Sequence, residues 1–305
     1  MRVGVIGSGA TGGYLAAKLA HAGISVTLVA RGESYARIEH EGIVVNDPDG
    51  TRIVARPEQL IKPGGVATPA VDLVLFCVKS YDTNEAAAAL TAVAGDHARV
   101  LCLQNGVRNE EVLADLIGPA RLLSGVLYIG ARRTAPGVID CTSPPRIHLG
   151  DYVGQPSPDL DSILDVFRSA NLDIAADDRI RAQKWQKFLF NCALNPLTAL
   201  IQRPLGDILA RPSGRHLYGS LLEEAIAVGR AHGAPIPSDA GDKVWEQGNR
   251  MNILSSMAED VAAGRPLEID AFTGYVHELG DRHGVETPVS GVVLDMLKTL
   301  DPAAA

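Results

Sequence analysis

The stretch VGVIGSGATGGYLAAKLAHAG, residues 3–23, decides the fold of the first part of the chain. Val3 to Ile6 is a short apolar run rich in β-branched residues, which predicts a buried strand. Six residues with glycine at the first, third and last positions follow, and helical apolar spacing then runs from Tyr14 to Ala22. Gly23 ends that pattern, as glycine commonly does just after a helix. The segment therefore predicts a strand, a glycine turn and a helix.

The glycine turn has the spacing of a dinucleotide phosphate site, which we expect to be formed by Gly7, Ser8, Gly9, Ala10, Thr11 and Gly12. The first glycine permits the tight turn, the second lets a pyrophosphate approach the backbone, and the third lets helix and strand pack closely. The helix N-terminus adds N–H donors and a positive dipole. The simpler interpretation is a structural turn with spare glycines, which the strand–helix–strand context disfavours.

Strands and helices alternate through the first part of the chain, which predicts a parallel sheet. The expected strands are 25–30, 71–78, 99–103 and 124–128, with helices at 83–94 and 109–116, and 138–140 and 146–149 are expected as short antiparallel strands. After residue 177 the pattern is helical, at 179–200, 214–232, 239–263, 269–283 and 289–300. We expect Pro196 to kink or break the first of these helices. The fold prediction is an α/β Rossmann-type domain over residues 1–177, followed by an all-α domain over residues 178–305.

Composition and charge narrow the classes of partner. The chain of 305 residues carries a net charge of −8, which favours neither nucleic acid nor an anionic membrane. No apolar run approaches the roughly 18 residues that span a bilayer. The four cysteines are scattered singly, without zinc-ligand spacing, so we expect a reduced, metal-free, cytoplasmic protein. A homodimer is compatible with this interpretation.

The residue after the second expected strand bears on the choice of cofactor. NAD enzymes usually place an acid there to accept a hydrogen bond from the ribose 2′-OH, whereas this chain has Arg31. An arginine suits a 2′-phosphate, so we expect NADPH to be the cofactor. A slightly longer strand would instead bring Glu33 within reach of the ribose. A solvated surface arginine is the plainer alternative for Arg31.

Two further strand ends carry polar residues, Lys79 after one and Asn105 within Gln-Asn-Gly after the next. Ligands bind at the carboxyl ends of parallel strands. Lys79 could therefore neutralise a cofactor phosphate, and Asn105 could bind ribose, nicotinamide or substrate. Each also has an ordinary explanation, because lysine often ends a strand in solvent and Asn-Gly is a common turn.

Two polar groups interrupt the helical part of the chain. Lys187, Asn191 and Asn195 are each four residues apart, so they share one face of an otherwise apolar helix. Lys184 extends this stripe and favours a solvated helix edge, whereas asparagine is a poor choice for such an edge. Ser255-Ser256-Met257, Asp260 and Glu268 form the second group. These residue types also have a purely structural explanation. The first four would lie inside a helix, and Glu268 would be an acid near the N-terminus of the next helix.

Taken in order, these motifs resemble the ketopantoate reductase (2-dehydropantoate 2-reductase) family over residues 1 to about 298. The resemblance implies NADPH-dependent reduction of 2-dehydropantoate to (R)-pantoate in pantothenate biosynthesis. It implies that Lys187 is catalytic and that Glu268 binds the cofactor. It also implies a set of substrate contacts at Asn105, Asn191, Asn195 and Ser256. A lysine there can act as the general acid that protonates the carbonyl oxygen.

One departure from the family pattern leaves other functions open. The family often has Asn three residues before the second serine, and this chain has Ile253, with Asn252 one place away. A paralogous reductase of another 2-oxo acid is therefore an alternative. A β-hydroxyacid dehydrogenase is a second one, although residues 181–186 lack the glycines that such enzymes carry before the lysine. A non-catalytic NADPH-binding sensor is the third.

Overall fold

The computed structural model describes residues 1–154 and 156–304, which divide into two units. The first unit contains residues 1–104 and 109–180, and the second contains residues 105–108 and 181–305. The division near residue 180 lies three residues beyond the boundary expected from the sequence. The separate segment 105–108 was not expected, because nothing local marks it as part of the second unit.

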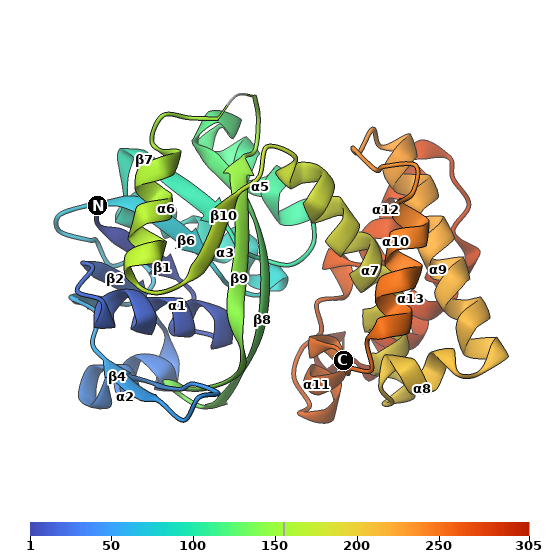
Figure 1. Cartoon of the computed structure of the whole chain (residues 1–305), viewed down its shortest axis with the longest axis horizontal. Helices are drawn as coiled ribbons and strands as arrows, with labels where there is room; N and C mark the ends of the chain where they lie inside the picture. Colours follow the sequence, from blue (N-terminus) through green and yellow to red (C-terminus); the bar gives the residue numbers. More distant parts are fainter. Residues whose placement is uncertain (155, 305) are drawn as a thin grey trace. The chain divides into compact units, whose positions relative to one another are not determined.

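One sheet of ten strands organises the described part of the first unit, in the order β4-β3-β9-β8-β7-β6-β1-β2-β5, with β10 beside β9 (Figure 1). The strands β1, β2, β5, β6, β7 and β8 are parallel neighbours along this order, and β9 runs antiparallel to β8. Their bounds are β1 Val3–Ile6, β2 Val26–Val29, β3 Ile43–Asn46, β4 Arg52–Ala55, β5 Gln59–Ile61, β6 Val71–Phe76, β7 Ala94–Cys102, β8 Leu122–Ala135, β9 Val138–Asp151 and β10 Asp173–Ala176.

Alternation along the strands produces a core on each face of the sheet. Leu73 and Leu75 of β6 join one apolar cluster, whereas Val74 and Phe76 join the other, because successive side chains point to opposite faces. Residues of α1 and α6 belong to the first cluster, and Figure 1 shows both helices in front of the sheet. Residues of α3, α4 and α5 belong to the second cluster. The helices of this unit are α1 Ala10–His21, α2 Gly32–Glu41, η1 Ser80–Asp82, α3 Thr83–Ala87, α4 Leu90–Val93, α5 Arg108–Ile117, η2 Pro119–Arg121 and α6 Leu160–Ser169.

Several strands differ from the expectation. The two short strands expected at 138–140 and 146–149 are one long strand, β9, whose register against β8 shifts at three places. Such irregularities allow a long ladder to bend without ending. The strands β3, β4, β5 and β10 were missed, because runs of three or four residues carry little periodicity.

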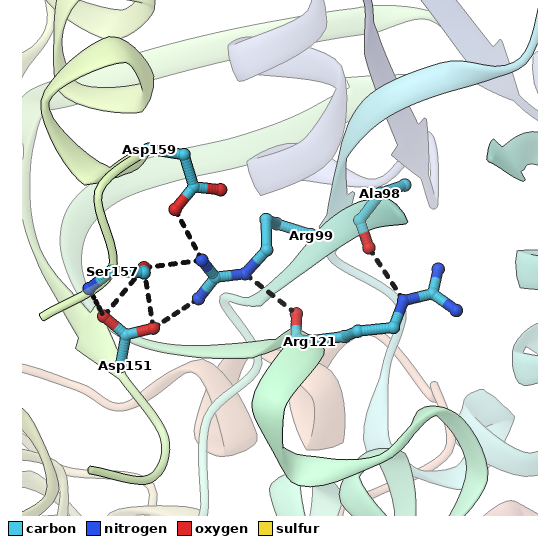
Figure 2. Close-up of polar contacts among 6 residues, drawn as sticks. All are labelled: Ala98, Arg99, Arg121, Asp151, Ser157 and Asp159. Carbon is cyan, nitrogen blue, oxygen red and sulfur yellow. Dashed lines mark hydrogen bonds and ion pairs between the residues drawn. The ribbon is translucent and has the colours of Figure 1, made fainter. Parts of the chain in front are cut away.

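A buried arginine ties the end of β9 to β7 in the first unit (Figure 2). The Arg99 guanidinium forms ion pairs with Asp151 and with Asp159, the latter at 2.6 Å, and donates to the Ser157 hydroxyl at 2.5 Å. Its Nε also donates to the carbonyl oxygen of Arg121 at 3.4 Å. Because both Arg99 and Asp151 are almost inaccessible to solvent, each charge depends on the other for compensation.

The second unit is built from helices around its own apolar core, which includes Phe188, Leu189, Tyr218 and Tyr275. Helix α7 continues through Pro196, so of the expected kink or break the break does not occur. The residues on both sides of the proline are buried, and this packing outweighs the single backbone bond that proline removes. The helices are α7 Ile180–Ile201, α8 Leu205–Leu209, α9 Pro212–Ala231, α10 Ala240–Arg250, α11 Ser256–Ala262, η3 Ile269–Ala271, α12 Thr273–His283, α13 Pro288–Leu300 and η4 Pro302–Ala304.

The single helix expected over 239–263 is two helices, α10 and α11, separated by residues 251–255. Ser255 begins the second of them, because its hydroxyl accepts a hydrogen bond from the Ala258 N–H at 3.1 Å. The hydroxyl of Thr198 on α7 donates to the same Ser255 oxygen at 2.6 Å. A serine that looked like part of a continuous helix is therefore a helix cap.

Candidate functional site

The glycine turn between β1 and α1 has the geometry that its spacing predicts. Gly7 has a φ of +109°, and a Cβ there would lie 2.9 Å from the backbone nitrogen of Val78. A Cβ on Gly12 would lie 2.0 Å from the Gly7 carbonyl oxygen. A side chain at position 7 would clash with the backbone that follows β6, and one at position 12 would force α1 away from the glycine turn. The close approach therefore requires both glycines.

Gly9 occupies the other kind of position in the turn, because a Cβ there would meet nothing within 4 Å. The residue is the N-cap of α1, and it contributes no capping side chain. The first N–H groups of a helix have no partner within the helix, so they are available to an anion. Ser8, Ala10 and Thr11 beside it are partly buried. The open space over Gly9 and the helix start fit the pyrophosphate of a dinucleotide.

Arg31 lies two residues beyond Val29, the last residue of β2, and is the N-cap of α2. Its guanidinium pairs with Asp82 at 2.6 Å and lies 3.6 Å from the Glu85 carboxylate, while its side chain is 59% exposed. The Asp82 hydrogen bond raises the pKa of Arg31, which stays charged. Because β2 ends at Val29 and Glu33 lies in the first turn of α2, the longer strand that would place Glu33 at its end is not formed.

The loops that follow β6 and β7 are joined by a polar network that the sequence did not reveal. Lys79 is the N-cap of η1, and its carbonyl oxygen accepts from the Asp82 N–H at 2.9 Å. The Gln104 amide donates to the Thr83 hydroxyl at 2.8 Å and to the Val78 carbonyl oxygen at 3.0 Å. The Thr83 hydroxyl in turn donates to the Asn109 amide oxygen at 3.0 Å. These bonds fix the loops after β6 and β7 relative to each other.

Asn105 belongs to the second unit because its segment is bound there. The Arg108 guanidinium pairs with Glu278 at 2.6 Å and stacks 5.6 Å from the centre of the Tyr275 ring. Gly106 has a φ of +83°, and a Cβ there would lie 2.9 Å from the Ala271 carbonyl oxygen. The segment 105–108 is therefore held against η3 and α12, with Asn105 at its start.

The polar stripe on α7 is not a solvated edge. Asn191 is 8% exposed and Asn195 is 4% exposed, and Lys187 is partly buried. The Lys187 ammonium donates to the Asn105 amide oxygen at 2.8 Å, which joins two predicted site residues that are 82 positions apart. The structure therefore brings Asn105 of the Gln-Asn-Gly loop and the Lys-x3-Asn helix together within the second unit.

The environment of Lys187 changes its protonation. Burial, followed by the positive charge of Lys184, lowers the pKa of Lys187 from 10.5 to about 7. Lys184 is only 4% exposed, so of the two interpretations left open by the sequence the solvated edge does not hold. A lysine that titrates near neutral pH can both hold and release a proton, which is the requirement for a general acid.

The second polar group is spread over several positions in the same unit. Ser256 is exposed at the first turn of α11, and Glu268 is buried at the start of η3. The buried Asp260 forms an ion pair with Arg265 at 2.8 Å. Ile253 is 38% exposed in the segment between α10 and α11, and the Asn252 side chain lies where a Cβ on Gly206 would be.

Two kinds of feature are absent among the residues that the structure describes. The described residues include no cluster of three or more His, Cys, Asp or Glu side chains that could hold a metal ion. Within the described ranges, no helix combines the length and apolarity needed to cross a membrane.

Comparison with known proteins identifies relatives over the whole chain. Residues 3–154 match the profile of "Ketopantoate reductase PanE/ApbA", and residues 179–301 match "Ketopantoate reductase PanE/ApbA C terminal". The 2-dehydropantoate 2-reductase of Halobacterium salinarum is 32% identical over 300 residues, which cover 98% of each chain.

Solved structures agree with this match. A PanE/ApbA family ketopantoate reductase from Ralstonia eutropha JMP134 superposes with a TM-score of 0.89 at 29% identity, covering 100% of this chain and 99% of that one. A D-mandelate dehydrogenase solved with NADH and anilino(oxo)acetate shares the fold, with a TM-score of 0.90 at 18% identity and coverage of 100% and 99%. The predicted fold class and family resemblance are thereby confirmed.

Proposed function

Since the chain belongs to the ketopantoate reductase family, we propose that it reduces 2-dehydropantoate to (R)-pantoate with NADPH, a step of pantothenate biosynthesis. The family consists of oxidoreductases that use a nicotinamide cofactor and act on a CH–OH group. We place the reaction in the cytoplasm, in line with four cysteines that are all free. Residues 1–177 would bind the cofactor phosphates, and residues 178–305 would carry the catalytic lysine.

The observation that carries this proposal is the bond from Lys187 to Asn105, made by a lysine whose pKa lies near 7. When bound, the reduced nicotinamide supplies a hydride to the C2 carbonyl carbon of a 2-oxo acid. Negative charge then develops on the carbonyl oxygen, and the Lys187 ammonium donates a proton to it. The products are a 2-hydroxy acid, the oxidised cofactor and a neutral lysine, which regains its proton from solvent.

Buried amides explain how the substrate can be held without a second charge. Asn191 and Asn195 lie one and two turns beyond Lys187 on the same helix face. A hydrogen bond from such an amide to a charged substrate oxygen contributes about 1.5–3 kcal/mol, so these groups can hold the substrate carboxylate. The Asn105 amide oxygen accepts the hydrogen bond of the Lys187 ammonium until the carbonyl oxygen of the substrate takes its place as acceptor. Ser256, exposed at the start of α11, would contribute a further hydroxyl contact.

The residues of the first unit support NADPH as the cofactor. Gly7, Gly9 and Gly12 leave room for the pyrophosphate at the start of α1, together with the backbone of residues 8, 10 and 11. Arg31 would pair with the 2′-phosphate, and Lys79 would add a second positive charge. Glu268 and Asn105 are proposed as further cofactor contacts.

A specific feature favours a second candidate, the reduction of a different 2-oxo acid. Ile253 is partly exposed where an asparagine is common in the family, so one polar substrate contact is replaced by an apolar one. A 2-oxo acid with an apolar substituent would suit such a position better than the hydroxyl of 2-dehydropantoate.

The test is oxidation of NADPH, followed by its near-ultraviolet absorbance, with 2-dehydropantoate and a panel of other 2-oxo acids. We expect 2-dehydropantoate to give the highest kcat/KM and (R)-pantoate to be the product. A higher kcat/KM for an apolar 2-oxo acid would support the second candidate. Tight NADPH binding without turnover of any 2-oxo acid would refute both and favour a sensor.

A further inference from the structure

Arg31, in the segment after β2, forms an ion pair with Asp82, an acid from the segment after β6. The Asp82 carboxylate accepts a hydrogen bond from the Arg31 guanidinium at 2.6 Å, although the two residues are 51 positions apart. Glu85 lies 3.6 Å from the same guanidinium. Two carboxylates around one guanidinium give this group a formal charge of −1. A 2′-phosphate that approached Arg31 would therefore meet two anions as well as one cation.

Asp82 is held in place by its neighbours. Its N–H donates to the Lys79 carbonyl oxygen at 2.9 Å. The next residue, Thr83, is buried and takes part in the hydrogen bonds with Gln104 and Asn109. Asp82 itself is less exposed than Arg31, with side-chain exposures of 22% and 59%. Asp82 is thus the more buried partner of the pair, and Arg31 is the more exposed one.

The pairing of Arg31 with Asp82 affects the two cofactors differently, because NADH carries a ribose 2′-OH and NADPH carries a 2′-phosphate. A 2′-OH can donate a hydrogen bond to a carboxylate, which is the role of the acid at the second strand end in NAD enzymes. A 2′-phosphate is an anion, and it can pair with the guanidinium only if Asp82 releases it or shares it. β2 carries no acid at its own end, and Asp82 supplies one from the loop after β6.

We infer that Asp82 is a specificity-determining residue that competes with the 2′-phosphate for Arg31 and narrows the preference for NADPH over NADH. This inference rests on the proposed use of a nicotinamide cofactor and adds a second determinant to Arg31. Arg31 favours the phosphorylated ribose, and Asp82 favours the unphosphorylated one. Their pairing leaves this chain able to accept both cofactors with a smaller preference than Arg31 alone would give.

The test is isothermal titration calorimetry of the full-length protein and its Asp82→Asn variant with NADP⁺ and NAD⁺. Asparagine keeps the size of the side chain and removes the charge. We expect the variant to bind NADP⁺ about 10-fold more tightly, the scale of one charge-assisted hydrogen bond. NAD⁺ binding should be unchanged or weaker, so the affinity ratio rises. The matched control is Glu85→Gln, which removes a more distant and more exposed charge and should change the ratio less than about twofold.

Binding separates this inference from the proposed reaction, because calorimetry does not depend on turnover. If the Asp82→Asn protein binds NADP⁺ less tightly, or if the ratio stays unchanged, the inference is overturned whatever the enzyme reduces. If the ratio rises while no 2-oxo acid is turned over, the inference stands and the proposed reaction fails.

Discussion

Replacement of Lys184 by methionine should move the pH dependence of the reaction without removing a reacting group. Lys187 must be protonated to act as an acid, so with a pKa of about 7 the rate of reduction falls as the pH rises through neutrality. The charge of Lys184 is the second cause of that low pKa, after burial. Methionine keeps much of the apolar volume of the side chain and removes the charge. The pKa of Lys187 should therefore rise. The part of the pH profile in which the rate falls, here called the falling limb, should move to higher pH.

The size of this movement can be estimated from the spacing of the two lysines. Residues three apart on a helix have side chains about 6 Å apart. Two unit charges at that distance repel by about 2.8 kcal/mol at an effective dielectric constant of about 20, and by half of that value at about 40. At 1.36 kcal/mol for each pH unit, the lower value corresponds to a movement of about one unit, which also keeps the contribution of Lys184 below that of burial.

The assay is kcat for NADPH oxidation, measured with saturating 2-oxo acid from mildly acidic to alkaline pH. The control is Lys243→Met, because Lys243 is an exposed lysine of the same unit and pairs with Asp239 at 2.9 Å. It should leave the limb in place. An unmoved or lowered limb in the folded Lys184→Met protein would refute the account of the Lys187 environment.

Four further substitutions test other parts of the account. Arg31→Ala should weaken NADPH binding by roughly 10- to 150-fold and leave NADH binding nearly unchanged, as measured by fluorescence titration; equal losses would show that Arg31 does not bind the 2′-phosphate. Asn191→Ala and Ser256→Ala should each raise KM more than they lower kcat in steady-state kinetics, and unchanged kinetics would exclude both from the substrate site. Arg99→Leu should lower the free energy of unfolding by about 3 kcal/mol in urea titrations, because it leaves the buried Asp151 carboxylate uncompensated, and a loss under about 1 kcal/mol would show that solvent reaches that carboxylate.

Local patterns predicted much of the fold and part of the site. The spacing of Gly7, Gly9 and Gly12 depends on contacts within one turn, so it could be interpreted without the rest of the chain. The face shared by Lys187 and Asn191 follows from helix geometry alone. The family resemblance then supplied roles that residue types could not.

What the sequence did not predict depends on contacts between distant segments. The bond between Lys187 and Asn105 and the ion pair between Arg31 and Asp82 each join residues more than fifty positions apart. The burial of Lys184 has the same origin, because a lysine on a helix looks solvated until its surroundings are known. Short strands such as β5 were missed because three residues cannot show an alternation.

The most direct test of the central claim compares kcat of the wild-type protein and the Lys187→Ala variant, with NADPH and 2-dehydropantoate at saturation. The account predicts that the variant folds and binds NADPH as the wild type does, and that its kcat is about 10²- to 10⁴-fold lower, because the developing alkoxide loses its proton donor. A folded Lys187→Ala protein that turns over at the wild-type rate would contradict the assignment of Lys187 as the general acid.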